Sequence, residues 1–167
     1  MLALSACSSE GDEPTGDQSS TPSASLTADP KQVEARDAAL AAFHGMREEQ
    51  VKAYAKGKAS GTRLSTYAAD KALSKIESEL FKYRQAGVVF TGKPTSEAKV
   101  TAVDLKRNPH KATITECFDT TAWKAMKDGK DVTSPNQVHR YTVTGAVRTV
   151  GERWMVVDYN VDKERTC

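Results

Sequence analysis

Residues 30–85 carry the apolar periodicity of helices. From residue 31 to 56 the apolar side chains recur at steps that sum to a period of 3.6, and they are Val33, Leu40, Phe43, Val51 and Tyr54. Asp29 and Pro30 suit a helix start, and Gly57 suits its end. We therefore expect a long helix over 31–56, a short helical piece over 62–69, and a third helix that ends at Gln85.

After Gly87 the period changes to two, which indicates strands. The expected strands cover 88–91, 98–107, 111–119, 137–150 and 153–161, with a polar loop over 128–136. Along 111–119, Ala112, Ile114, Glu116 and Phe118 share one face. A two-residue turn at Gly151-Glu152 would place Gly145 opposite Asp158. This order predicts an α+β domain in which about three N-terminal helices pack on an antiparallel sheet of four to five strands.

The chain is long enough for one domain, with 167 residues and 38% hydrophobic residues. Residues 8–28 consist almost entirely of Ser, Thr, Gly, Pro and acidic residues, which predicts a flexible tether. All five charged side chains of residues 1–29 are acidic, so residues 30–167 hold 24 basic and 17 acidic side chains. Such a basic body is attracted to anionic lipids or wall polymers. The alternative is a solvated, Lys-rich surface without a partner.

The segment Leu4-Ser5-Ala6-Cys7 resembles the lipobox of bacterial lipoproteins. The resemblance implies that Cys7 is diacylated on sulfur and becomes the mature N-terminus. Only six residues precede Cys7 and none is basic, so we interpret 1–6 as the remnant of a signal peptide. Met1 is then an internal start within a longer gene, or the sequence lacks part of the signal peptide. We expect a domain over 29–167 that is lipid-anchored on the extracytoplasmic face of the cell membrane through the tether 7–28. The alternative is a chance motif in a cytosolic protein.

Cys117 and Cys167 form an even pair if Cys7 carries lipid. In an oxidising compartment we expect them to form a disulfide, and the alternative is two unpaired thiols. The sequence has no Cys-x-x-Cys and no His beside either Cys, which argues against structural zinc. His44 and Glu48 share a helical face but lack a third ligand, so we expect no metal.

The order of helices and strands resembles that of the nuclear-transport-factor-2-like (cystatin-like) family. The segment 153–159, Arg-Trp-Met-Val-Val-Asp-Tyr, looks like the last strand of its small secreted actinobacterial members. The resemblance covers 29–167 and implies a curved sheet that forms a cone, whose mouth often holds a ligand. The pocket candidates are Asp158, His139, Tyr141 and Trp123, the last in a loop over the mouth. Alternatively, Asp158 is a polar group at the rim, and His139 and Tyr141 are ordinary strand surface.

Three functions are compatible with this pattern. The first is a non-enzymatic, lipid-anchored module that binds an envelope protein or a small apolar ligand. The second is an enzyme of the isomerase or cyclase type, in which burial raises the pKa of Asp158 and Tyr141 assists. The third is a structural subunit of an envelope complex. No phosphate-binding loop is present and the Lys residues are scattered among acids, so we expect neither a cofactor nor nucleic acid as a partner. The oligomeric state stays open.

Overall fold

The computed structural model describes residues 29–167 and shows an α+β domain, which confirms the predicted fold class. Cys7 and the predicted tether lie outside the described residues. The helices are α1 (Pro30–Lys56), α2 (Leu64–Tyr67) and α3 (Asp70–Gln85). The strands are β1 (Val88–Gly92), β2 (Thr95–Asp104), β3 (Lys111–Asp119), β4 (Trp123–Lys127), β5 (Lys130–Asp131), β6 (Arg140–Val150) and β7 (Arg153–Asp162).

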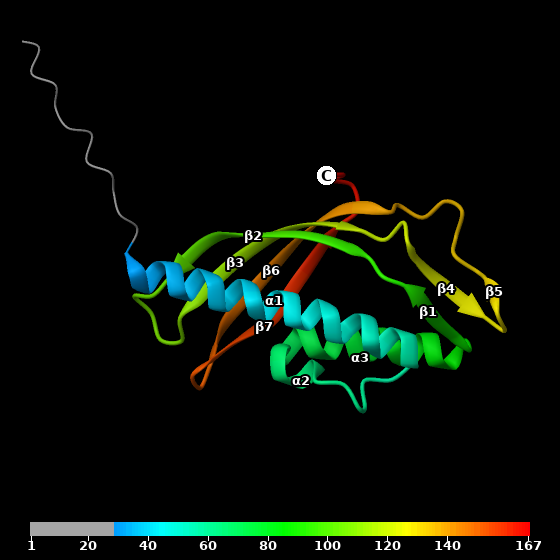
Figure 1. Cartoon of the computed structure of the whole chain (residues 1–167), viewed down its shortest axis with the longest axis horizontal. Coiled ribbons are helices and arrows are strands. Elements are labelled where there is room, and N and C mark those ends of the chain that lie inside the picture. Colours follow the sequence, from blue (N-terminus) through cyan, green and yellow to red (C-terminus); the bar gives the residue numbers. More distant parts are fainter. Residues whose placement is uncertain (1–28) are drawn as a thin grey trace, which may run out of the picture.

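The strands form two antiparallel sheets, and the helices cover one face of the larger one (Figure 1). The larger sheet has the order β2-β3-β6-β7, and the smaller one has the order β1-β4-β5. The sequence did not predict β4 or β5, because Lys124, Lys127 and Lys130 give this segment a polar composition. Pairing with β1 nevertheless makes β4 a strand. The smaller sheet extends the structure beyond the end of the larger one and helps to enclose the site described below.

Helix α1 begins and ends at the predicted residues. The Asp29 carboxylate accepts the backbone N–H of Lys31 at 3.0 Å, and Pro30 occupies the first turn, where no intrahelical donor is needed. Gly57 ends the helix with φ of 65°, in the left-handed region that glycine adopts without strain. The helix packs on the larger sheet through buried Ala39, Ala42, Phe43, Met46 and Ala53.

The β6–β7 hairpin contains a bulge that changes the predicted register. Next to the turn, Thr149 lies opposite Trp154 and Val147 lies opposite Val156, as the expected two-residue turn requires. The register then shifts by one residue between Ala146 and Val147, so the predicted pairing of Gly145 with Asp158 is wrong. Gly145 lies opposite Tyr159, because the extra residue of a bulge reverses which side chains face the core. Tyr159 is consequently buried in the position that alternation assigned to Asp158.

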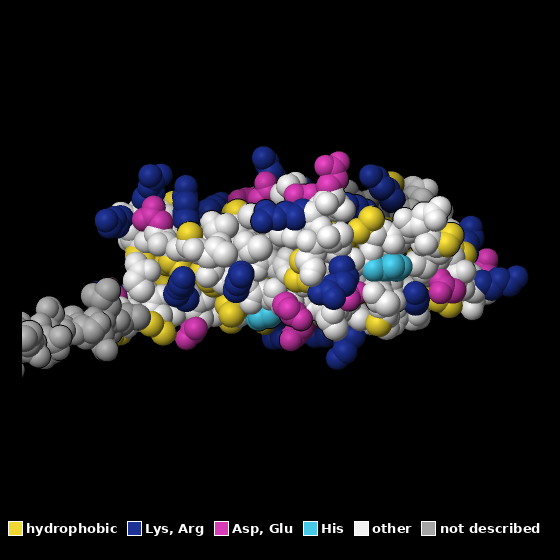
Figure 2. Space-filling view, turned by 90° about the horizontal axis from the view of Figure 1, so that it is seen from above, with side chains coloured by type: hydrophobic (Ala, Val, Ile, Leu, Met, Phe, Trp, Pro, Cys, Tyr) yellow, Lys and Arg dark blue, Asp and Glu magenta, His cyan; other side chains and the backbone are white. Residues whose placement is uncertain are grey.

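Within residues 29–167, the face of the larger sheet that lies away from the helices carries no concentrated patch of basic side chains (Figure 2). Its Lys and Arg side chains are scattered among acidic and hydrophobic ones. None of the three helices is both long enough and apolar enough to cross a bilayer.

Candidate functional site

A cavity of about 650 Å³ lies where the helices meet both sheets. Side chains from α1, α3, β1, β3, β4, β6 and β7 line it, together with the segment between β5 and β6. Seven of the lining side chains are aromatic: Tyr54, Tyr83, Phe90, Phe118, Trp123, Tyr141 and Tyr159. The volume falls within the range of about 300–1,000 Å³ that is usual for small-molecule pockets.

Four of these aromatic residues form one continuous wall. The ring of Phe90 lies 5.3 Å from that of Tyr54, 4.8 Å from that of Tyr83 and 4.9 Å from that of Trp123, measured between centroids. These are the distances and tilted geometries that aromatic pairs prefer. Trp123 is not in a loop over the mouth, as the sequence suggested, but is the buried first residue of β4. The wall offers ring faces and edges to any molecule in the cavity.

The floor of the cavity includes Arg47, which belongs to a buried ion pair whose acidic partner, Glu116, lies behind the lining. Arg47 of α1 donates from Nη2 to Oε2 of Glu116 at 2.5 Å and from Nε to Oε1 at 3.1 Å. Glu116 is fully buried, and Ser96 also donates to its carboxylate. The guanidinium lies 4.3 Å from the ring centre of Phe118, and Nη1 donates to Gln50 at 2.7 Å. Sequence reasoning placed Glu116 on an apolar face but missed its partner, because Arg47 lies 69 residues away in the chain.

The tyrosines of the cavity keep their hydroxyl protons at neutral pH. Burial raises the pKa of Tyr141 to about 12, and burial with the nearby Glu79 carboxylate raises the pKa of Tyr54 well above its usual value. The Tyr54 hydroxyl donates to Glu79. The Tyr159 hydroxyl and the Trp123 indole N–H are buried and have no hydrogen-bond partner within residues 29–167. Such unpaired donors are unusual in folded proteins, so we expect a hydrogen-bond acceptor from outside residues 29–167 to bind them.

Two of the four pocket candidates lie elsewhere. Asp158 does not line the cavity; its carboxylate accepts a hydrogen bond from Lys75 of α3 at 2.6 Å. That hydrogen bond holds the pKa of Asp158 below its usual value, the opposite of what a buried general base requires. His139 precedes β6, and its backbone oxygen accepts the N–H of Thr120 at 2.9 Å. Trp123 and Tyr141 do line the cavity.

The interior of the domain is filled near the centre of α1. Phe43 is fully buried and packs against Gly145, where an added Cβ would lie 2.6 Å from the Phe43 ring. Phe118 is buried, and Trp154 is partly buried against the same core. The cavity therefore lies at the end of the domain that the aromatic wall encloses and does not extend to the centre of α1.

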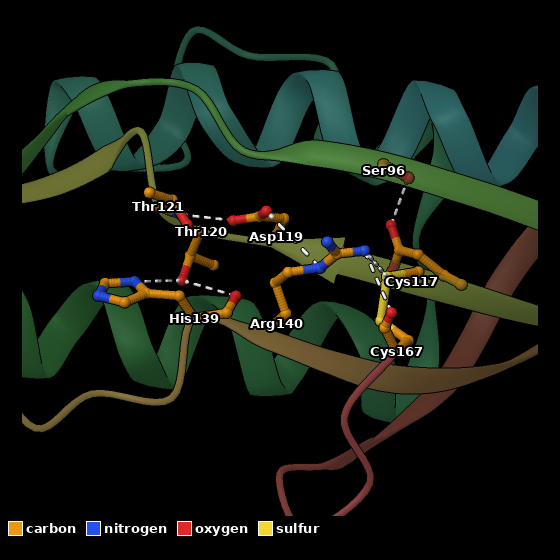
Figure 3. Close-up of a disulfide and its surroundings, with 9 residues drawn as sticks. Ser96, Cys117, Asp119, Thr120, Thr121, His139, Arg140 and Cys167 are labelled. Atoms are coloured by element: carbon orange, nitrogen blue, oxygen red, sulfur yellow. Dashed lines mark hydrogen bonds and ion pairs between the residues drawn. A yellow bond between two sulfur atoms is a disulfide. The ribbon is translucent and has the colours of Figure 1, made fainter.

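The disulfide between Cys117 and Cys167 is present, as predicted. It lies on the face of the larger sheet opposite the helices, and Arg140 donates to the carbonyl of Cys167 at 3.1 Å (Figure 3). The backbone N–H of Thr142 donates to the carbonyl of Arg165 at 2.9 Å. These contacts hold the last residues against the central strands β3 and β6. No group of three or more His, Cys, Asp or Glu side chains within residues 29–167 is arranged to hold a metal ion.

Comparisons with known proteins give little further information. No family model and no curated protein sequence matches this chain. Among solved structures, the intermembrane space region of the chloroplast protein ARC6 is similar at a TM-score of 0.43 and 13% identity. The match covers 80% of this chain and 95% of that one. A likeness of this size supports no inference about function, so the cavity itself is the basis for one.

Proposed function

We propose that this protein is a non-enzymatic, lipid-anchored module of the bacterial cell envelope that binds a small apolar molecule in its aromatic-lined cavity. The observation that carries the proposal is the cavity of about 650 Å³ with its seven aromatic side chains. Concave sites of this size lined by aromatic side chains are typical of small-molecule binding, and here polar side chains contribute to the lining as well.

The exposed apolar surface of the cavity favours the binding of a ligand, because the ligand would remove that surface from water. The cavity opens to solvent beside exposed Val132, Val138 and Val161, which all belong to its lining. Apolar surface that a ligand removes from water stabilises the complex by roughly 25 cal/mol per Å². The order of three helices followed by antiparallel strands also supports our assignment to the nuclear-transport-factor-2-like family, whose cones often hold ligands.

A dye that fluoresces in apolar surroundings tests the binding. N-phenyl-1-naphthylamine is neutral, and we expect its emission to rise on titration with the protein. Ala125 lines the cavity on β4, so Ala125→Trp fills the space and is expected to weaken dye binding at least tenfold. Ala102→Trp is the matched control, because Ala102 is exposed on β2 and does not line the cavity. Equal dye binding by both variants, or none by the folded wild type, would contradict the proposal.

The proposed membrane anchor has a separate test. The Cys117–Cys167 disulfide supports an oxidising, extracytoplasmic location, since such bonds are rare in the cytosol. It also leaves Cys7 as the cysteine available for acylation. We expect the native protein to partition into the detergent phase of a membrane extract and to carry the mass of a diacylglyceryl group at Cys7. Cys7→Ser should release it into the aqueous phase. A native protein with an unmodified Cys7 would refute the anchor without affecting the binding proposal.

A further inference from the structure

The polar groups that line the floor of the cavity are mainly hydrogen-bond donors. The two buried, unpaired groups are the Trp123 indole N–H, a donor only, and the Tyr159 hydroxyl. Trp123 is 7% exposed and Tyr159 is 6% exposed, and both side chains line the cavity. Neither polar atom is in contact with solvent, so bulk water does not satisfy them. A buried donor without a partner is costly, and a ligand acceptor would remove that cost.

Arg47 and Gln50 add further donors to the same floor. A guanidinium carries five N–H groups, and Arg47 uses three of them on Glu116 and Gln50 within the described residues. The oxygen of Gln50 accepts one of these hydrogen bonds. The NH₂ group of Gln50 is a further donor. The floor therefore complements a group that accepts hydrogen bonds.

The charges around the cavity argue that this acceptor is neutral. The charge of Arg47 is matched by Glu116, which has no exposed surface. Glu79 and Lys163 are the other charged residues of the lining, and they have opposite signs. The two cations and two anions in and beside the lining already balance, so a ligand carboxylate would add an uncompensated negative charge. An ammonium group cannot accept hydrogen bonds from the donors of the floor, and the positive charge of Arg47 would repel it.

We propose that the ligand is a neutral, planar aromatic molecule with a carbonyl-type acceptor that takes hydrogen bonds from Trp123 Nε1 and the Tyr159 hydroxyl. This inference rests on the proposed binding function and specifies the ligand class. The rings of the ligand stack on the wall formed by Tyr54, Phe90 and Trp123 while the acceptor points to the floor. Because neither polar atom is exposed, this binding mode requires a rotamer change of neighbouring side chains, which is common on binding.

Four probes of nearly equal size separate the possible ligand chemistries. They are 2-acetylnaphthalene, which is a neutral acceptor, 2-ethylnaphthalene, which has no acceptor, 2-naphthoate, which is an anion, and 2-naphthylmethylammonium, which is a cation. Ligand-observed NMR titration of the full chain gives the four dissociation constants. We expect the ketone to bind about tenfold more tightly than the ethyl compound, because one or two net hydrogen bonds distinguish them. The two ions should bind more weakly than the ketone.

Substitutions of Tyr159 and Trp123 test whether these donors cause the preference for the ketone over the ethyl compound. Tyr159→Phe should reduce the tenfold preference for the ketone to about threefold or less, while the affinity for 2-ethylnaphthalene stays unchanged. Tyr67→Phe is the matched control, since Tyr67 lies on α2 outside the cavity, and it should change neither affinity. Trp123→Phe should act like Tyr159→Phe. If this variant fails to fold, the wild-type comparison and Tyr159→Phe still decide the question.

Several results would overturn the inference while leaving the proposed function intact. Equal binding of the ketone and the ethyl compound would show that the donors are not used. Tightest binding of the cation would instead favour a site at Glu79, and tightest binding of the anion would favour one at Arg47. Failure of all four probes in a protein that still binds N-phenyl-1-naphthylamine would also refute this ligand class. Loss of the dye binding itself would refute the proposed function.

Discussion

Removing the charge of Glu116 is predicted to destabilise the domain strongly. Glu116 is fully buried and accepts hydrogen bonds from Arg47 and Ser96. In Glu116→Gln, one carboxylate oxygen becomes an NH₂ donor that faces the donors of Arg47. The charge of Arg47, whose side chain is only 7% exposed, then has no counterion. Breaking one partner of a buried pair costs about 3–5 kcal/mol.

The position of Arg47 favours the lower end of that range. Its side chain lines the cavity, so water can approach it more easily than a charge in a closed core. We expect a loss of about 3 kcal/mol in the free energy of unfolding, which corresponds to a fall of roughly 10–15 °C in Tm for a domain of this size. Far-UV circular dichroism during urea and thermal unfolding, with the disulfide intact, measures both quantities.

Two further variants make this prediction specific to the pair. Glu97→Gln on β2 removes an exposed carboxylate and should change the stability by less than about 0.5 kcal/mol. The double variant Arg47→Met with Glu116→Leu removes both charges and should recover at least 2 kcal/mol of the loss, since apolar replacement of a buried pair is often neutral or stabilising. A loss below about 1 kcal/mol in Glu116→Gln, or no recovery in the double variant, would refute the reasoning.

Other predictions concern the disulfide, acid stability and packing. Reduction of Cys117–Cys167, which are 50 residues apart, should lower the free energy of unfolding by about 4 kcal/mol in the chain-entropy model, measured by urea unfolding with and without reductant; equal midpoints would contradict this. The hydrogen bond from Lys52 holds the pKa of the buried Glu49 below its ordinary value, so its contribution to stability is present above the ordinary pKa of glutamate and is lost as pH falls through the lowered value. Glu49→Gln should therefore flatten the acid limb of a stability–pH profile, and an unchanged limb would disprove this role. Gly145→Ala should cost about 1–3 kcal/mol because its Cβ would meet the Phe43 ring at 2.6 Å, and a thermal melt that matches wild type would show that the core can adjust.

Local patterns in the sequence were sufficient for the helices and for strands β1, β2, β3, β6 and β7. The 3.6-residue period and the caps at Asp29 and Gly57 defined α1, because these are interactions between residues close in the chain. Alternation over 111–119 placed Glu116 on the inner face of β3, since side chains of a strand alternate between its two faces. The pairing of Cys117 with Cys167 was predicted from the two cysteines that remain if Cys7 carries lipid.

The site depended on information that a local pattern does not contain. A bulge in β7 moved Asp158 out of the expected position and put Tyr159 there, and alternation alone cannot reveal one unpaired residue. The short strand β4, which carries Trp123 into the aromatic wall, forms only because β1 pairs with it. The sequence by itself thus determined which faces are apolar and which cysteines pair. Only the tertiary structure decided that Arg47 compensates Glu116 and that the aromatic residues enclose a cavity, because contacts between distant segments arise from packing.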